Sequence, residues 1–198
     1  PHSSAAMRAA SYYSPLSSFY DRTGGIGFYQ FLEKITERCS KEEGYRLKLG
    51  KKLMEVAKTL FTASNMTISY TADEEGYGRL PAALAAFKAV LPEGNGIRYP
   101  YEFKPELKNE GFRTASQVNY VARCGTFGES AYTGALKVLK VILNYEYLWV
   151  NLRVKGGAYG CMSSFGRNGE TMLVSYRDPK LGETNRVYEG ILEYLRTF

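Results

Sequence analysis

Hydrophobic residues recur at helical spacing through the first half of the chain. The first predicted helix follows a glycine-rich turn at 24–27 and keeps the i, i+3, i+4, i+7 pattern at Phe28, Phe31, Leu32 and Ile35. A second predicted helix has its apolar side at Leu49, Leu53, Val56, Ala57 and Leu60. A third is expected to start near Pro81, since proline is tolerated in a first turn. Between the last two, residues 65–71 alternate β-branched, aromatic and polar side chains, which predicts a strand.

The second half of the chain predicts the order β-α-β-β-α. A strand is expected at 116–124, followed by a helix over 130–149 that is apolar on all sides and is therefore expected to be buried. The next strand ends near 165, and Asn168-Gly169 is a strong signal for a hairpin turn into a returning strand at 171–176. The last helix is predicted from Val187, Ile191, Tyr194 and Leu195.

Proline and glycine interrupt the periodicity between these two halves, at Pro92, Gly94, Gly96, Pro100 and Pro105. Such a stretch is typical of a linker. We therefore expect an α+β protein with a first module at 1–92, a linker at 93–109 and a second module at 110–198. The last helical pattern is still running at Phe198 and the chain begins with Pro1, so we expect a piece of a longer polypeptide.

The composition narrows the chemistry. The 198 residues include 26 Lys and Arg against 20 Asp and Glu, and this net charge of +6 is scattered along the sequence. No apolar run reaches the roughly 18 residues of a membrane span, so no membrane partner is expected. The only histidine, His2, excludes a Ser-His-Asp triad and a His-based zinc site within this chain. The three cysteines lack metal-ligand spacing and indicate free thiols in a reducing compartment.

The segment from Arg153 to Gly160, with the sequence Arg-Val-Lys-Gly-Gly-Ala-Tyr-Gly, is the main candidate for chemistry. Arg153 offers a planar fork of donors suited to a carboxylate, a carbonyl or an oxyanion, and the glycine pair allows close backbone approach to a ligand. In this interpretation Arg153 and Tyr159 face one ligand. The alternative is a helix that ends at a glycine cap, with Tyr159 as the first core residue of the next strand.

Two other motifs are weaker. The 24–27 glycine turn lacks both the third glycine of a dinucleotide fingerprint and the Gly-Lys-Ser/Thr of a P-loop, so it indicates a helix entry. The order β-α-β-β-α and the basic charge leave an RNA-binding module as an alternative. The residues at 160–164 provide no aromatic platform for stacking bases, so we expect no nucleic acid partner.

Several blocks of the sequence resemble the pitrilysin/insulinase family of inverted zincin metallopeptidases, and within it the presequence-protease group. The blocks are Gln117-Val118-Asn119-Tyr120-Val121, Leu148-Trp149, the segment from Arg153 to Gly160, and Ser175-Tyr176-Arg177-Asp178-Pro179. The upstream pairs Gly25-Ile26 and Phe31-Leu32 and the segment 65–74 fit the same register. The resemblance covers nearly the whole chain and is densest at 110–180.

The resemblance implies a clamshell enzyme of two halves, each with two α+β domains in which a mixed sheet packs against helices. Such an enzyme holds its zinc with a His-x-x-Glu-His motif in the N-terminal half, outside this chain. It implies that Arg153 and Tyr159 contact the substrate peptide and the developing oxyanion, with Gly156, Gly157 and Ala158 as substrate-binding positions.

We therefore expect part of the C-terminal half of a zinc metalloendopeptidase that degrades unstructured peptides. Its expected partners are the peptide and the N-terminal half of the same polypeptide, and the segment alone is expected to be inactive and to hold no metal. A catalytically silent partner subunit of the same family is the alternative. The expected location is the bacterial cytoplasm, or else a mitochondrial or other organelle matrix.

Overall fold

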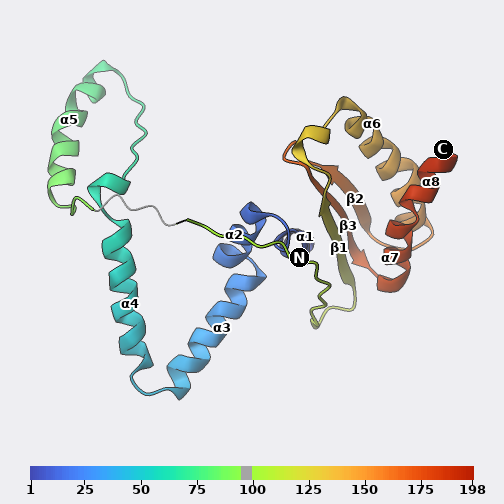
Figure 1. The fold of residues 1–198 in the computed structure, drawn as a ribbon, viewed down its shortest axis with the longest axis horizontal. Coiled ribbons are helices and arrows are strands. Elements are labelled where there is room, and N and C mark those ends of the chain that lie inside the picture. Colours follow the sequence, from blue (N-terminus) through green and yellow to red (C-terminus); the bar gives the residue numbers. More distant parts are fainter. Residues whose placement is uncertain (95–99) are drawn as a thin grey trace. The chain divides into compact units, whose positions relative to one another are not determined.

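The computed structural model describes residues 1–94 and 100–198, and the chain separates into two compact units (Figure 1). One unit combines Pro1–Leu32 with Phe103–Phe198, and the other is Glu33–Glu102. The predicted linker at 93–109 is without regular secondary structure where it is described, and Gly96 lies outside the described residues. The division into family domains at 1–92 and 110–198 stays a prediction.

A three-stranded sheet in the order β1-β3-β2 forms the centre of the first unit. Its strands are β1 (Asn119–Thr126), β2 (Gly160–Phe165) and β3 (Glu170–Asp178). The predicted hairpin turn is confirmed, with Gly169 at φ +78° between β2 and β3. Both pairings are antiparallel, so these strands do not make the mixed sheet that was expected, whereas the α+β class is confirmed.

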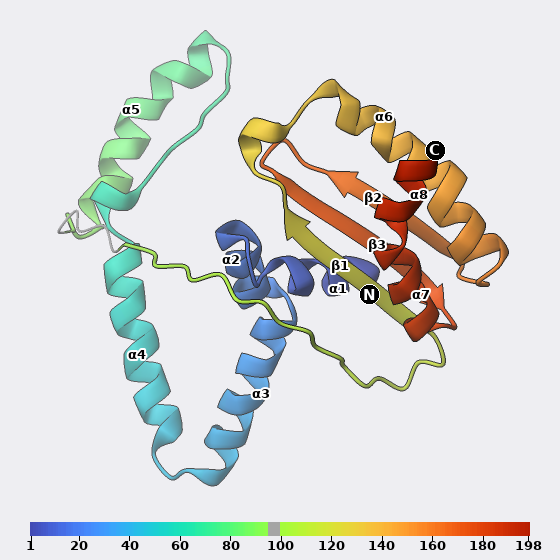
Figure 2. The same cartoon turned by 45° about the vertical axis from the view of Figure 1, so that its right-hand side comes forward.

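Helices from the C-terminal part of the chain cover one face of this sheet (Figure 2). They are α6 (Gly134–Ile142), the π-helix η3 (Leu143–Val154), α7 (Leu181–Glu189) and α8 (Ile191–Thr197), with the short 3₁₀ turn η2 (Glu129–Ala131) before them. The core on this face consists of Val121, Leu143, Leu148, Leu152, Ala158 and Tyr188. The three strands and these helices follow one another along the chain in the predicted order β-α-β-β-α.

The expectation that the helix over 130–149 is buried is wrong for the side that faces away from the sheet. Leu143 and Leu148 are buried against the sheet, but Val138 and Val141 keep 60% and 56% of their surface exposed. A helix that packs on one side of a sheet buries only one stripe, so an all-round apolar sequence leaves the outer stripe unpartnered within this unit.

Two helices that the sequence analysis did not predict, α1 (His2–Ala10) and α2 (Pro15–Gly24), complete this unit. Helix α1 packs on the second face of the sheet, where the Cys124 thiol lies 3.6 Å from the Ala6 carbonyl oxygen and the His2 ring lies 5.2 Å from the Tyr176 ring. The alanine- and serine-rich sequence of α1 has no helical hydrophobic pattern that would predict it. The helix is held by its contacts with β1 and β3.

Helices are the only regular secondary structure among the described residues of the second unit. Its elements are α3 (Ile26–Lys41), which begins in the first unit, α4 (Tyr45–Leu60), the 3₁₀ turn η1 (Ala63–Asn65) and α5 (Glu74–Ala89). The strand predicted at 65–71 is wrong: residues 66–73 have no regular secondary structure, and no strand lies among the described residues of this unit to pair with them. Helix α5 starts earlier than predicted, where Asp73 caps the Gly76 N–H, and Pro81 lies inside the helix.

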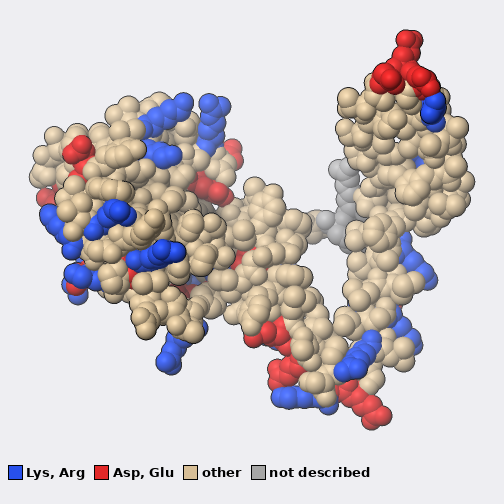
Figure 3. Space-filling model, turned by 180° about the vertical axis from the view of Figure 1, so that it is seen from behind, with Lys and Arg blue, Asp and Glu red and all other residues tan. Residues whose placement is uncertain are grey.

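Both positively and negatively charged side chains are spread over the face shown in Figure 3. Within the described ranges, no helix is both long and apolar enough to cross a membrane.

Candidate functional site

The candidate site begins at the C-terminal end of η3, where Arg153 lies on the last turn. The turn closes with two hydrogen bonds, from the Gly157 N–H to the Arg153 carbonyl and from the Ala158 N–H to the Leu152 carbonyl. This is a glycine cap one residue wider than in an α-helix, as expected for a π-helical end.

Both glycines of this cap are required by the backbone. A Cβ on Gly156 would lie 2.5 Å from the Leu152 carbonyl oxygen, and Gly157 has φ +83°, a region that L side chains rarely adopt. The helix-cap interpretation therefore holds for the glycines. The assignment of Gly156, Gly157 and Ala158 as substrate-binding positions stays a prediction.

Ala158 and Tyr159, the two residues before β2, differ in burial. Ala158 is 3% exposed and belongs to the core, whereas Tyr159 is 57% exposed. The N–H of Tyr159 is shared between the carbonyls of Tyr176 and Arg177, at 3.2 and 3.3 Å. The alternative interpretation, with Tyr159 as a core residue, is wrong: the buried residue is its neighbour Ala158, and Tyr159 is exposed.

The structure brings Arg153 and Tyr159 together in a stack of alternating aromatic and cationic groups. The Arg153 guanidinium lies 4.6 Å from the Trp149 ring centroid and 5.3 Å from that of Tyr159. The Arg177 guanidinium lies 5.2 Å from the same Tyr159 ring. These distances are within the range of cation–π attraction.

Sequence reasoning assigned no role to Trp149 or Arg177, although both lie in blocks that carry the family resemblance. Trp149 is one helical turn before Arg153, a spacing that could have identified the contact. No pattern in the sequence places Arg177 beside Tyr159, because the two residues meet only through the pairing of β2 with β3.

The site is positively charged. In the part of the chain that the structure describes, neither Arg153 nor Arg177 forms an ion pair with a carboxylate, although Arg8, Arg123 and other arginines do. Two guanidinium groups without carboxylate partners and an exposed phenol provide hydrogen-bond donors for a carbonyl, a carboxylate or an oxyanion.

Cys161, two residues after Tyr159, is not a nucleophile at neutral pH. Burial raises the pKa of its thiol to about 11, and the charge of nearby Arg153 only partly opposes this effect. A thiol with such a pKa stays protonated near pH 7, and the reactive species is the thiolate. Among the described residues, no three His, Cys, Asp or Glu side chains are grouped so that they could hold a metal ion.

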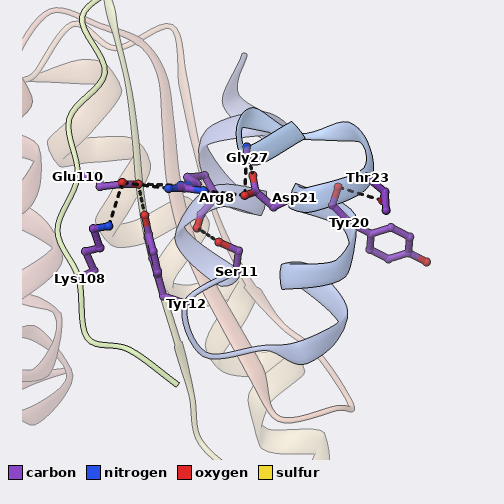
Figure 4. Close-up of polar contacts among 9 residues, drawn as sticks. All are labelled: Arg8, Ser11, Tyr12, Tyr20, Asp21, Thr23, Gly27, Lys108 and Glu110. Carbon is purple, nitrogen blue, oxygen red and sulfur yellow. Dashed lines mark hydrogen bonds and ion pairs between the residues drawn. The ribbon is translucent and has the colours of Figure 1, made fainter. Parts of the chain in front are cut away.

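A second polar cluster lies at the entry to α3, over the glycine turn at 24–27 (Figure 4). The Asp21 carboxylate accepts hydrogen bonds from the Gly27 N–H at 3.2 Å and from Arg8 at 2.7 Å, and its side chain is only 3% exposed. A Cβ on Gly27 would lie 2.4 Å from this carboxylate. The turn therefore holds an anion that belongs to the protein itself at the start of a helix, which confirms the helix-entry interpretation.

Glu110 extends this cluster to the segment before β1. It accepts hydrogen bonds from Arg8 Nε at 2.7 Å and from the Tyr12 hydroxyl, and Lys108 lies 3.3 Å away. The hydrogen bonds from Arg8 are the main reason that the pKa of Glu110 falls to about 2. Through these contacts the cluster connects α1 and α2 to residues 108–110, which indicates a structural role.

The segment that contains the site is similar to known proteins. Residues 109–198 match the PreP C-terminal domain. Over its whole length the chain is 34% identical to "Protein HypA" of Clostridium perfringens. Over 98% of its length it is 28% identical to presequence protease 1, chloroplastic/mitochondrial, of Arabidopsis thaliana and 26% identical to the mitochondrial presequence protease of Kluyveromyces lactis. The chain spans about a fifth of the length of these relatives, at 20%, 18% and 21%.

Proposed function

With residues 109–198 belonging to the PreP C-terminal domain family and the whole chain related to presequence proteases, we propose that this chain supplies the substrate clamp of a zinc metalloendopeptidase for unstructured peptides. The observation that carries the proposal is the pair of Arg153, which is half-buried, and Tyr159, which is exposed, held side by side at a hydrogen-bonded helix-to-strand turn. The relatives named as presequence proteases support the class of reaction.

In the proposed mechanism, the Arg153 guanidinium and the Tyr159 hydroxyl donate hydrogen bonds to a backbone carbonyl of the bound peptide near the scissile bond. These bonds strengthen as negative charge develops on that oxygen, which lowers the barrier to attack by water. Because the glycine cap and the strand fix both residues before the peptide arrives, little reorganisation is needed.

The zinc ion of such an enzyme supplies Lewis-acid chemistry at the scissile bond. The residues of this chain do not fit a zinc site of this family, since its single histidine, His2, packs against Tyr176. The metal is therefore proposed to be bound by the remaining part of the longer polypeptide, and no step assigned to this chain involves it. The proposed partners are the peptide and that remaining part.

The decisive experiment substitutes Arg153→Ala and Tyr159→Phe in the full-length protein. Each substitution is expected to lower turnover on the order of 10²-fold, as for a single oxyanion donor, with zinc content and unfolding midpoint unchanged. Unchanged turnover in both variants would refute the clamp, and loss of zinc together with unfolding would assign the pair a structural role. The 198-residue chain alone is proposed to be inactive, so zinc-dependent hydrolysis by this purified segment would also refute the proposal.

A catalytically silent subunit of the same family remains the second candidate, because its fold and its Arg-Tyr pair would be the same. The two differ in the part of the protein that carries the zinc motif, so the presence or absence of an intact His-x-x-Glu-His sequence upstream distinguishes them.

The matched relatives include a bacterial protein and proteins named for mitochondria and chloroplasts. We propose the bacterial cytoplasm as the location, with an organelle matrix as the alternative.

A further inference from the structure

Arg177 lies at an irregularity of the sheet beside the Arg153–Tyr159 pair. Tyr120 of β1 pairs with Tyr176, and the next pair is Asn119 with Asp178, so Arg177 has no partner on β1. It also has φ +48°, and it is the only residue other than glycine with a positive φ in the described parts of the chain. An extra residue of this kind is a β-bulge, which bends a strand and changes the direction of a side chain.

The bulge is fixed by the residue that follows it. The buried Asp178 carboxylate accepts hydrogen bonds from the Ser175 hydroxyl at 2.5 Å and the Thr184 hydroxyl at 2.6 Å. It also accepts one from the Lys180 N–H at 2.8 Å, and the Asn119 side chain donates to the Asp178 carbonyl at 2.9 Å. A strained residue persists when its surroundings determine its conformation, and here the bonds of Asp178 do so.

Backbone needs alone would favour glycine at position 177, because glycine adopts a positive φ without strain. An arginine stands there instead, and its exposed guanidinium lies 5.2 Å from the Tyr159 ring centroid. The carbonyls of Tyr176 and Arg177 also share the Tyr159 N–H. The bulge thus contacts both the backbone and the ring of Tyr159.

We infer that Arg177 is a positioning residue that holds the Tyr159 ring in its substrate-facing orientation through the bulge. The inference rests on the proposed function and adds a residue to it. An exposed tyrosine just before an edge strand can adopt several rotamers, and attraction to the Arg177 guanidinium favours one of them. The competing role is direct binding of a substrate carboxylate by Arg177, which would be independent of Tyr159.

A double-mutant cycle in the full-length protein separates the two roles. Arg177→Ala, Tyr159→Ala and the double variant are compared by kcat and KM on a neutral peptide and on an acidic peptide of equal length. If Arg177 acts through Tyr159, Arg177→Ala lowers kcat roughly 3- to 30-fold on both peptides, the size expected from one cation–π contact. The double variant is then no slower than Tyr159→Ala alone.

Additive effects of the two substitutions, or a loss confined to the KM of the acidic peptide, would overturn the inference. Arg167→Ala is the matched control, since Arg167 is an exposed arginine of the same unit that lies near a different ring, that of Tyr132. It is expected to leave kcat and KM unchanged.

Arg177→Gly keeps the test independent of folding, because glycine relieves the positive φ while it removes the guanidinium. This variant is expected to unfold at the same or a higher urea concentration than the wild type and to lose kcat as Arg177→Ala does. The ¹⁹F resonance of fluorotyrosine placed at position 159 should shift in both variants and not in Arg167→Ala. If Arg153→Ala and Tyr159→Phe lower turnover but Arg177→Gly does not, the inference fails while the proposed function stands.

Discussion

The Arg153 guanidinium lies 5.3 Å from the Tyr159 ring centroid, across a glycine cap that joins a π-helix to a strand. The cap fixes both residues by backbone hydrogen bonds, so the pair is formed before any ligand binds. A preformed pair of donors avoids much of the entropy cost of ordering side chains on binding. Substitutions that disturb the glycine cap should therefore also disturb the Arg153–Tyr159 pair.

Trp149 should report on Arg153, because it is the only tryptophan of the chain and its ring lies 4.6 Å from that guanidinium. In the 198-residue chain, Arg153→Ala is expected to change the emission maximum and the acrylamide quenching of Trp149. Arg123→Ala, which removes an exposed arginine paired with Glu189, is the control and should leave the emission unchanged. Identical spectra for all three proteins would contradict the stacked arrangement.

Gly156→Ala should destabilise the first unit by roughly 2–4 kcal/mol, because a Cβ would lie 2.5 Å from the Leu152 carbonyl oxygen and would force the cap apart. Gly157→Ala should cost about 1 kcal/mol through its positive φ. Urea unfolding followed by circular dichroism measures both. Gly182→Ala in α7, where an added Cβ meets nothing within 4 Å, is the control and should stabilise by up to about 1 kcal/mol.

Asp178→Ala should be among the most damaging substitutions in the sheet, since it removes the acceptor of three hydrogen bonds at a buried position. Leaving buried donors unsatisfied is expected to cost roughly 2–4 kcal/mol in the free energy of unfolding. Ser175→Ala removes only one of these donors and should cost about 1 kcal/mol. A loss for Asp178→Ala no larger than that for Ser175→Ala would argue against a fixed bulge.

Arg8→Ala should destabilise the first unit by roughly 3 kcal/mol, because it leaves the Asp21 carboxylate, 3% exposed, without its cation. Arg123→Ala breaks an exposed ion pair of the same unit and should cost no more than about 1 kcal/mol. Chemical denaturation of the two variants side by side gives the comparison. Equal losses in the free energy of unfolding would mean that the Asp21 cluster does not stabilise the unit more than an exposed ion pair does.

Glu110 should make stability depend on pH in acid. Its pKa falls from 4.5 in the unfolded chain to about 2 in the folded protein, mainly through hydrogen bonds from Arg8. A lowered pKa means that the stabilisation is fully present above pH 4.5 and is lost as the pH falls toward 2. Denaturation midpoints measured between pH 6 and pH 2.5 should therefore fall less steeply in Glu110→Gln than in the wild type. Glu193→Gln, on the surface of α8, is the control.

Sequence patterns predicted the elements whose stability is largely local or carried by a strong turn signal. The hairpin at Asn168-Gly169, the glycine cap after Arg153 and the helices α3 and α4 all have their determinants within a few neighbouring residues. The strand expected at 65–71 was wrong because a strand needs a partner, and periodicity within one segment does not supply one. Helix α1 was missed for the converse reason, since its packing surface is provided by β1 and β3.

The sequence by itself determined that this chain contains one histidine, that Arg153 and Tyr159 flank a glycine pair, and that its blocks resemble a metallopeptidase family. Tertiary structure decided what those residues can do. The pairing of β2 with β3 presents the Tyr159 ring to the surface, and the bulge before Asp178 brings Arg177 onto the same ring. These contacts join residues that are far apart along the chain, and their distances depend on strand register, which is set by packing of the whole unit.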